Sequence, residues 1–171
     1  MREARGLISS GAIHGFKLHP PLQQFHANDQ IAYPFYEVLA EARLPVTFHT
    51  GHSGIGTGMP GGGGVRLKYA NPMDVDDMAV DFPDMPIILA HPAFPRRTTR
   101  FRFTCTSRKC TSIFRDGRPN TFSPTSIQCG NTLLKRKMPF GSDYPLITPN
   151  RRLADFAIPA TDCLCQGDGD C

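Results

Sequence analysis

Apolar and polar positions follow two alternating periods in the first half of the chain. Short apolar runs that stop near Pro or Gly predict strands, and longer stretches with apolar residues three or four apart predict helices. The predicted order is strand, helix, strand, helix, strand, which is typical of βαβ units and a parallel sheet. The strands are 15–19, 45–50 and 86–92; the helices are 31–43 and a segment that begins at Asn71.

The first predicted helix has one continuous apolar face. Within 31–43, helical spacing brings Tyr33, Tyr36, Leu39 and Ala40 to the same side. We therefore expect these four side chains to pack against the sheet.

The second predicted helix has a clear start signal. Asn71 suits the N-cap position and Pro72 the first helical position. The acidic residues that follow suit the positive end of the helix dipole. Its expected apolar side consists of Met73, Met78 and Val80; the acidic residues are Asp74, Asp76 and Asp77.

The remaining predictions concern the third strand and the C-terminal part. The run at 86–92 is continuously apolar, as in a strand buried on both faces of a sheet. A further strand is predicted over 138–145, and a short helix with Leu153 and Phe156 begins at Thr148 and Pro149. Residues 157–171 show no usable period and are expected to be unstructured.

Length and overall composition limit the class of protein. The 171 residues suit one domain of about 100–200 residues, and the formal net charge is +4. No apolar run approaches the length of a transmembrane helix, and the first residues lack the pattern of a signal peptide. We therefore expect a cytoplasmic protein without a membrane partner.

The charge is unevenly distributed. Residues 1–95 carry six basic and nine acidic side chains, a net of −3; residues 96–171 carry 13 basic and six acidic ones, a net of +7. All six cysteines lie after residue 95, and all six histidines lie before it. The sequence thus divides into 1–95, an atypical basic segment with cysteines at 96–129, a segment at 130–156, and the tail.

Two functional interpretations of the basic segment are weak. A nucleic-acid arm would show aromatic residues between its charges or a known motif, and the segment has neither. A zinc module would need paired C-x2-C spacing or accompanying histidines, which are missing here. We therefore expect no nucleic-acid partner, reduced cysteines, and a segment foreign to the fold of its flanks.

Polar side chains stand where the predicted strands end. His19, His49, His91 and Asp143 each end or follow a strand, and His52 lies three residues after His49. The carboxyl ends of parallel strands meet on one face, so these groups are expected to converge. Imidazole and carboxylate groups are ligands for Zn²⁺ and other divalent metals. One such histidine alone would more often be structural, but several on successive strands favour a site.

The segment after the second strand is rich in glycine. Its sequence over 50–64 matches neither the P-loop nor the Gly-x-Gly-x-x-Gly pattern, although a phosphate cradle stays open. A mobile lid over the strand ends is the favoured interpretation.

Four segments together resemble the amidohydrolase superfamily, in its amidohydrolase-related branch of metal-dependent decarboxylases, hydratases and hydrolases. They are Gly-Phe-Lys-Leu-His-Pro at 15–20, Leu-Pro-Val-Thr-Phe-His-Thr-Gly-His at 44–52, Ile-Ile-Leu-Ala-His-Pro at 87–92, and Phe-Gly-Ser-Asp-Tyr-Pro at 140–145. The resemblance implies an α/β fold of the (β/α)8 TIM-barrel type with a metal at the carboxyl ends of its strands. It covers about 15–95 and 130–156.

The resemblance also implies roles for the polar strand ends. His49 is similar to the metal-binding histidine of the fifth barrel strand, and Asp143 to the aspartate of the eighth, which binds metal and accepts a proton from water. His91 is similar to the sixth-strand histidine that contacts substrate or water, so the implied catalytic residues are His91 and Asp143. His19 and His52 take substrate-contact positions. The implied cofactor is a divalent metal, Zn²⁺ in the first place and otherwise Mn²⁺ or Mg²⁺.

The chain departs from the family pattern at two places. The His-x-His that ends the first family strand is missing, so the sequence corresponds to the C-terminal half of a barrel. The seventh strand, expected between 96 and 130, is replaced by the basic segment. We therefore hypothesise a truncated copy whose reading frame shifts near Pro95, recovers near Gly130 and is lost near Ala157.

The implied function is metal-dependent hydrolysis of a small carbonyl or carboxylate compound by an impaired fragment. A decarboxylase of the same family and a non-catalytic remnant are the alternatives. Association with other copies of the chain also stays open.

Overall fold

The protein is described from a computed structural model of all 171 residues. The residues that the structure describes are 2–91, 104, 109–113, 128, 130–132, 134–139, 141–142, 144 and 147–156.

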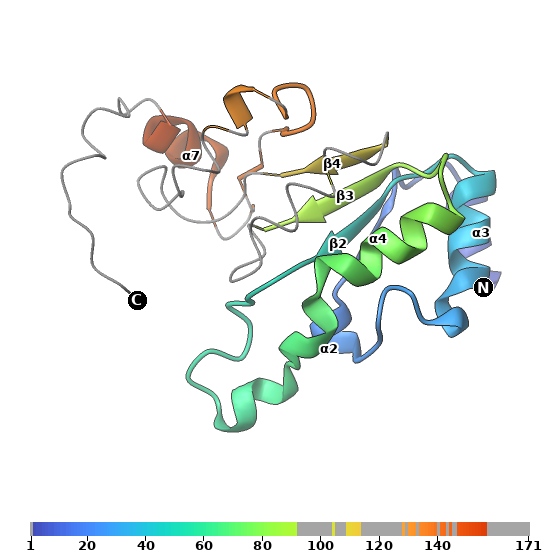
Figure 1. The fold of residues 1–171 in the computed structure, drawn as a ribbon, viewed down its shortest axis with the longest axis horizontal. Coiled ribbons are helices and arrows are strands. Elements are labelled where there is room, and N and C mark those ends of the chain that lie inside the picture. Colours follow the sequence, from blue (N-terminus) through green and yellow to red (C-terminus); the bar gives the residue numbers. More distant parts are fainter. Residues whose placement is uncertain are drawn as a thin grey trace.

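The centre of the molecule is a parallel sheet with the strand order β1-β2-β3-β4 (Figure 1). The strands are β1 (Phe16–Leu18), β2 (Val46–His49), β3 (Ile87–Ala90) and β4 (Cys110–Ser112). Each strand pairs in parallel with the next, as the alternating pattern predicts for the first three. The strands therefore all end at the same edge of the sheet.

Helices connect these strands. Between β1 and β2 the chain forms α3, and between β2 and β3 it forms α4, so the described part consists of the expected βα units. The helical elements are α1 (Arg2–Ser9), α2 (Pro20–Gln23), η1 (Gln30–Ala32), α3 (Tyr33–Glu41), η2 (Pro60–Gly64), η3 (Leu67–Ala70), α4 (Pro72–Asp81) and α7 (Pro149–Phe156).

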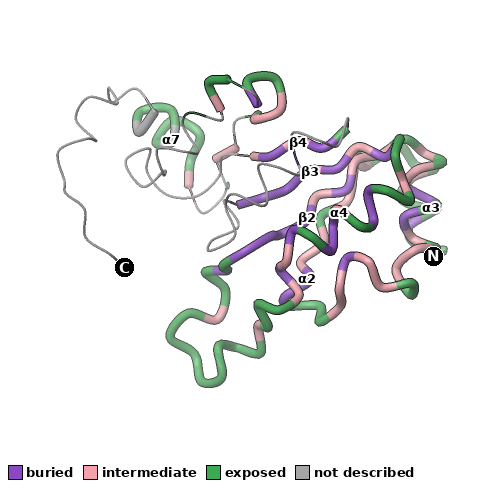
Figure 2. The backbone as a smooth tube through the Cα atoms, in the orientation of Figure 1, coloured by how far each residue is buried: buried purple, intermediate pink, exposed green. Residues whose placement is uncertain are grey.

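Helices α3 and α4 bury one face of the sheet. From α3, Tyr36 and Leu39 pack into the core, while Tyr33 and Ala40 lie partly buried against it, as the helical spacing predicts. The core also takes in alternate residues of the strands and the inner side of α4; Figure 2 shows the buried positions along these strands and helices. The strand members are Val46, Phe48, Ile87, Leu89 and Cys110, and those of α4 are Val75, Met78 and Ala79.

The predicted start of α4 is confirmed, but its predicted apolar side is partly wrong. The Asn71 side chain accepts a hydrogen bond from the backbone N–H of Met73, which is N-cap geometry. Met78 is fully buried, whereas Met73 is 41% and Val80 74% exposed. The helix is turned so that Val75 and Ala79 face the sheet instead, because residues three and four apart share a side.

The third strand is not buried on both faces along its length. In β3, Ile87 and Leu89 are buried under the helices, while Ile88 between them is only partly buried. The same alternation recurs in β2, where Thr47 is partly buried between two buried neighbours. The described helices thus cover one face. On the other face Thr47 and Ile88 are partly buried, whereas His49 and Ala90 are buried.

Strand β4 lies inside the basic segment, where no strand was predicted. It pairs with β3, and Cys110 is 1% exposed in the core, so this part of the segment belongs to the sheet. The expectation that the seventh strand is missing is therefore wrong. A Cys-Thr-Ser strand of three residues carries too little apolar pattern to be recognised.

The strand predicted over 138–145 is not seen in the described residues of that range, 138, 139, 141, 142 and 144. The carbonyl of Lys137, directly before it, nevertheless accepts a hydrogen bond of 2.8 Å from the backbone N–H of Ser112 in β4. The predicted C-terminal helix is present as α7, with Leu153 exposed. The tail at 157–171 lies outside the described residues, and the four-part division of the chain stays a prediction.

None of the described helices is long and apolar enough to cross a membrane.

Candidate active site

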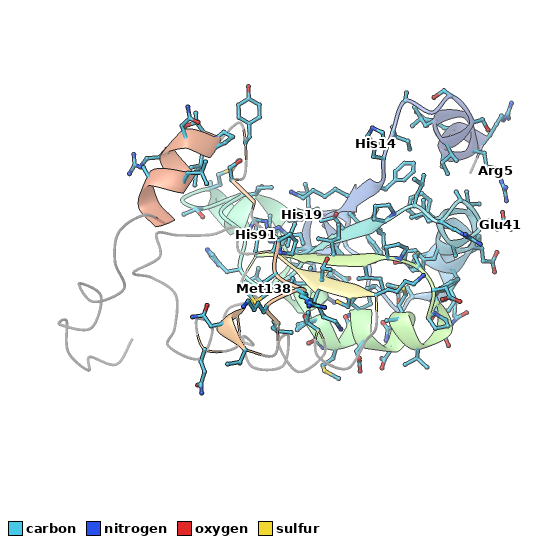
Figure 3. The ribbon with its side chains drawn as sticks, turned by 90° about the horizontal axis from the view of Figure 1, so that it is seen from above. Arg5, His14, His19, Glu41, His91 and Met138 are labelled. Atoms are coloured by element: carbon cyan, nitrogen blue, oxygen red, sulfur yellow. The ribbon has the colours of Figure 1, made fainter. Side chains whose placement is uncertain are left out.

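Three histidines meet at the carboxyl edge of the sheet. His19 follows β1 directly, His49 is the last residue of β2, and His91 follows β3 directly. The ring centroids of His19 and His49 are 4.0 Å apart, and those of His49 and His91 are 4.2 Å apart. Figure 3 shows His19 and His91 close together at one end of the sheet, far from the ion pair of Arg5 and Glu41 on the surface. The expected convergence of these three residues is thus present; their individual roles stay predictions.

The His19 ring is held by the short helix that follows it. Its Nδ1 accepts a hydrogen bond from the backbone N–H of Leu22 at 3.3 Å, and its own backbone N–H donates to Oε1 of Gln23 at 2.7 Å. Because Nδ1 is an acceptor, a neutral ring carries its proton on Nε2, which faces Oγ of Ser53 at 3.5 Å. Burial is the main cause that lowers the pKa of His19.

His49 is a buried, neutral imidazole. Its side chain is enclosed, with 4% of the residue exposed, and Nε2 donates to the backbone carbonyl of His52 at 3.1 Å. Burial, and after it the neighbouring His91 and His19, lower the pKa of His49 to about 3. The ring is therefore uncharged at neutral pH, with a lone pair on Nδ1. A neutral imidazole is the form that binds metal ions.

His91 occupies a strained backbone position. Its φ is +70°, in the left-handed region that residues with a Cβ seldom adopt, and the residue is 8% exposed. Such a conformation costs about 1–3 kcal/mol and persists where the surrounding structure requires it. The chain thus keeps a costly turn that places the third imidazole beside the other two.

The other two predicted site residues are placed differently. The His52 side chain is exposed, and its contact with the histidine group is made by its backbone carbonyl. Asp143 lies outside the described residues.

Sequence reasoning missed Ser53, which is 4% exposed and faces His19. Its signal was weak, because a serine in a glycine-rich loop is ordinarily a turn residue.

The glycine-rich segment after β2 leaves the sheet as a long exposed loop (Figures 1 and 2). It is fixed at both ends: the N–H of Gly51 donates to the carbonyl of Ala70, and the N–H of Arg66 donates to the carbonyl of Pro21. Between these anchors, residues 61–63 have three successive positive φ values near +60°. Only glycine adopts such a run at low cost. The predicted use of this loop as a lid stays a prediction.

The residues at this edge of the sheet fit a divalent metal only in part. His49 suits a metal ion, because its ring is neutral and the lone pair on Nδ1 is available for coordination. Within the described residues, however, no group of three or more His, Cys, Asp or Glu side chains could hold a metal ion. His49 is the predicted metal ligand that the structure describes, and the second predicted ligand, Asp143, lies outside the described residues.

The family profile for amidohydrolases matches residues 2–162. The chain belongs to the amidohydrolase family. The match runs through the basic segment and β4 as well as the histidine-bearing strands. No curated protein matches the chain significantly.

Three solved structures have a similar fold. An uncharacterized TIM-barrel protein from Bordetella bronchiseptica has a TM-score of 0.67 at 21% identity, covering 91% of this chain and 62% of its own. A dihydroxybenzoic acid decarboxylase from a Polaromonas species, with bound manganese, has a TM-score of 0.57 at 12% identity, covering 95% and 60%. A probable 2-pyrone-4,6-dicarboxylic acid hydrolase from Acinetobacter baumannii has a TM-score of 0.55 at 14% identity, covering 90% and 60%.

At these identities the likeness shows the fold alone, that of a partial TIM barrel. The chain spans less than two thirds of the length of these three structures.

Proposed function

We propose that this amidohydrolase chain acts in metal-dependent hydrolysis of a small carbonyl or carboxylate compound. The observation that carries the proposal is the row of three imidazoles at the carboxyl edge of the parallel sheet. In α/β folds of this kind, catalytic groups come from the ends of several strands. The family match supports the reaction class.

In this proposal His49 and Asp143 hold the divalent metal. A metal bound there would polarise a substrate carbonyl and lower the pKa of water. Zinc is the proposed ion, with manganese or magnesium as alternatives. The manganese bound in the Polaromonas decarboxylase supports manganese as an alternative.

The chain's own groups have separate proposed roles. His91 contacts the substrate or the attacking water, and Asp143 accepts the proton of that water. His19 binds substrate through Nε2–H, which is a donor while Nδ1 accepts from Leu22. His52 is a proposed substrate contact at the rim, since its side chain is exposed.

Histidine replacement tests this proposal. We expect H49A to reduce hydrolysis of 2-pyrone-4,6-dicarboxylate by about a hundredfold or more, because loss of a metal ligand removes the metal's contribution. Hydrolysis is followed by the proton released, with added zinc or manganese. H14A is the matched control, since His14 is exposed and lies away from His19 and His91 (Figure 3). Equal activity of H49A and H14A would contradict the proposal.

Decarboxylation is the second candidate, favoured by the Polaromonas decarboxylase among the similar folds. Release of carbon dioxide from dihydroxybenzoic acid, lost in H49A, would support it against hydrolysis. Absence of both activities in the wild-type chain would support the third hypothesis, a non-catalytic remnant.

A further inference from the structure

Two adjacent residues of the glycine-rich loop each face one of two stacked histidine rings. The backbone carbonyl of His52 accepts from Nε2 of His49 at 3.1 Å, and Oγ of Ser53 lies 3.5 Å from Nε2 of His19. The planes of the two rings differ by 28°. The start of the loop therefore contacts the same nitrogen of both neighbouring rings.

The direction of the contact between Ser53 and His19 follows from the other ring nitrogen. Nδ1 of His19 accepts a hydrogen bond from the backbone N–H of Leu22, so the neutral ring carries its proton on Nε2. A proton on Nδ1 would instead face the N–H of Leu22, donor against donor. The hydroxyl oxygen of Ser53 is thus the acceptor, and Nε2 of His19 is the donor.

This direction rules out a nucleophilic serine with His19 as its base. Such a serine needs an imidazole nitrogen that takes up its proton, and Nε2 of His19 already carries one. The oxygen of Ser53 is also fixed by a second donor, the backbone N–H of Ile55 at 3.1 Å, and the residue is 4% exposed. Ser53 is therefore an anchored acceptor for the His19 ring.

We infer that Ser53 is a positioning residue, which holds the His19 ring against His49 and directs its Nε2 proton until a ligand oxygen replaces the serine hydroxyl. The inference rests on the proposed function for the role of His19 as a substrate contact, and it adds the residue that orients this contact. The distance of 3.5 Å is long for a hydrogen bond, so a ligand oxygen at about 2.9 Å from Nε2 would form a stronger one.

The test follows the ring protons of the full chain labelled with ¹⁵N at histidine. In the wild type, two-bond correlations should place the proton of His19 on Nε2, and this proton should exchange slowly with water. We expect S53A to accelerate its exchange about fivefold or more, because the ring N–H loses its acceptor. We expect S53T, which keeps a hydroxyl group, to restore the rate of the wild type.

Two controls belong to this measurement. The Nε2 proton of His49 is the internal reference, since its acceptor is the backbone carbonyl of His52, which S53A keeps. S10A is the control variant, because Ser10 is an exposed serine whose hydroxyl donates to the carbonyl of Leu7. Both should leave their ring protons at the rates of the wild type.

Four results would overturn the inference. They are unchanged exchange of the His19 proton in S53A, a wild-type proton on Nδ1 of His19, a failure of S53T to restore the rate, and equal acceleration of the His19 and His49 protons in S53A. The last result would show that the serine holds the whole loop rather than one ring.

Activity measurements separate this inference from the proposed function. In a chain that hydrolyses 2-pyrone-4,6-dicarboxylate, S53A should raise KM about fivefold with a smaller effect on kcat. The double variant H19A/S53A should be no more impaired than H19A, because Ser53 acts through His19, and additive losses would overturn the inference. A chain whose His19 proton is protected by Ser53 but which shows no activity would refute the proposed function and leave the role of Ser53 standing.

Discussion

Two buried hydroxyl groups on adjoining parts of the sheet differ in their hydrogen bonding. Thr50 is 1% exposed, and its hydroxyl donates to the carbonyl of Ala90 at 3.0 Å, joining the end of β2 to the end of β3. Ser112 in β4 is fully buried, and its hydroxyl has no hydrogen-bond partner among the described residues. A satisfied buried hydroxyl contributes to stability, and an unsatisfied one carries a desolvation penalty.

Removal of each hydroxyl should therefore have opposite effects. We expect Thr50→Val to lower the free energy of unfolding by about 1 kcal/mol, and Ser112→Ala to leave it unchanged or raise it by about 1 kcal/mol. Urea unfolding followed by circular dichroism measures both. Clear destabilisation by Ser112→Ala would show that the serine hydroxyl has a partner in the folded chain.

At the scale of elements, an acid–imidazole pair fixes the loop before η1 to the start of α4. Nδ1 of His26 lies 2.6 Å from Oδ2 of Asp74, whose other oxygen accepts from the Asn71 side chain at 3.0 Å. Asp74 is 9% exposed, so both of its oxygens are bonded in a nearly buried position. Nearby, the exposed Asp77 accepts from the Asn28 side chain at 2.9 Å.

The buried carboxylate of Asp74 should contribute more to the stability of the fold than the exposed carboxylate of Asp77. We expect Asp74→Ala to cost about 2–3 kcal/mol, because it leaves a partly buried imidazole and an amide without their acceptor. We expect Asp77→Ala to change stability by no more than about 0.5 kcal/mol. Thermal unfolding of the two variants compares them directly, and equal effects would contradict the stabilising role of the His26–Asp74 pair.

The glycine-rich loop gives a second comparison between elements. A Cβ on Gly56 would lie 2.0 Å from the carbonyl oxygen of Gly62 across the loop, whereas a Cβ on Gly58 would meet nothing within 4 Å. Both residues have positive φ, +81° and +77°. Alanine is therefore backbone-strained at either position, but it clashes only at Gly56.

We expect Gly58→Ala to keep the loop conformation at a cost of about 1 kcal/mol, and Gly56→Ala to open it. Limited proteolysis of the loop reports the difference: cleavage should be faster in Gly56→Ala and nearly unchanged in Gly58→Ala. Similar cleavage of both variants would argue against the contact between Gly56 and Gly62.

The helices and strands that could be predicted from the sequence are those with a strong local pattern of residues. Strands β1 to β3 combine apolar runs with nearby Pro or Gly, and Asn71 with Pro72 marks the start of α4. β4 was missed because three residues of mixed polarity do not show a period. The face of α4 was partly misassigned because its moderate apolar content allows more than one side, and packing against the sheet decides between them.

At the scale of the whole molecule, the site follows from topology more than from any local motif. Parallel pairing alone brings His19, His49 and His91 to one edge, so their convergence could be predicted once three parallel strands were recognised. The contact between Ser53 and His19, and the backbone role of His52, depend on the path of the loop after β2. Such a path is set by long-range contacts with η3 and α2, which leave no pattern in the sequence.

The metal affinity of the whole chain depends on how many ligands its strand ends supply. In the proposed function, His49 and Asp143 would supply two protein ligands and His91 would make a third, where catalytic zinc sites ordinarily use three and structural sites four. The described residues contain no group of three or more side chains that could hold a metal ion. We therefore expect the purified chain to bind zinc weakly and to lose it on dialysis, as measured by elemental analysis.

A comparison of His49 with His52, three residues later, tests which histidine binds zinc. We expect H49A to abolish the residual zinc binding and H52A to leave it nearly unchanged, because His52 contacts His49 through its backbone carbonyl, which the replacement keeps. Titration with zinc in the presence of a competing chelator dye measures both affinities. Tightly held, stoichiometric zinc in the wild type would refute the expected weakness, and equal losses in H49A and H52A would refute the assignment of His49 as the ligand.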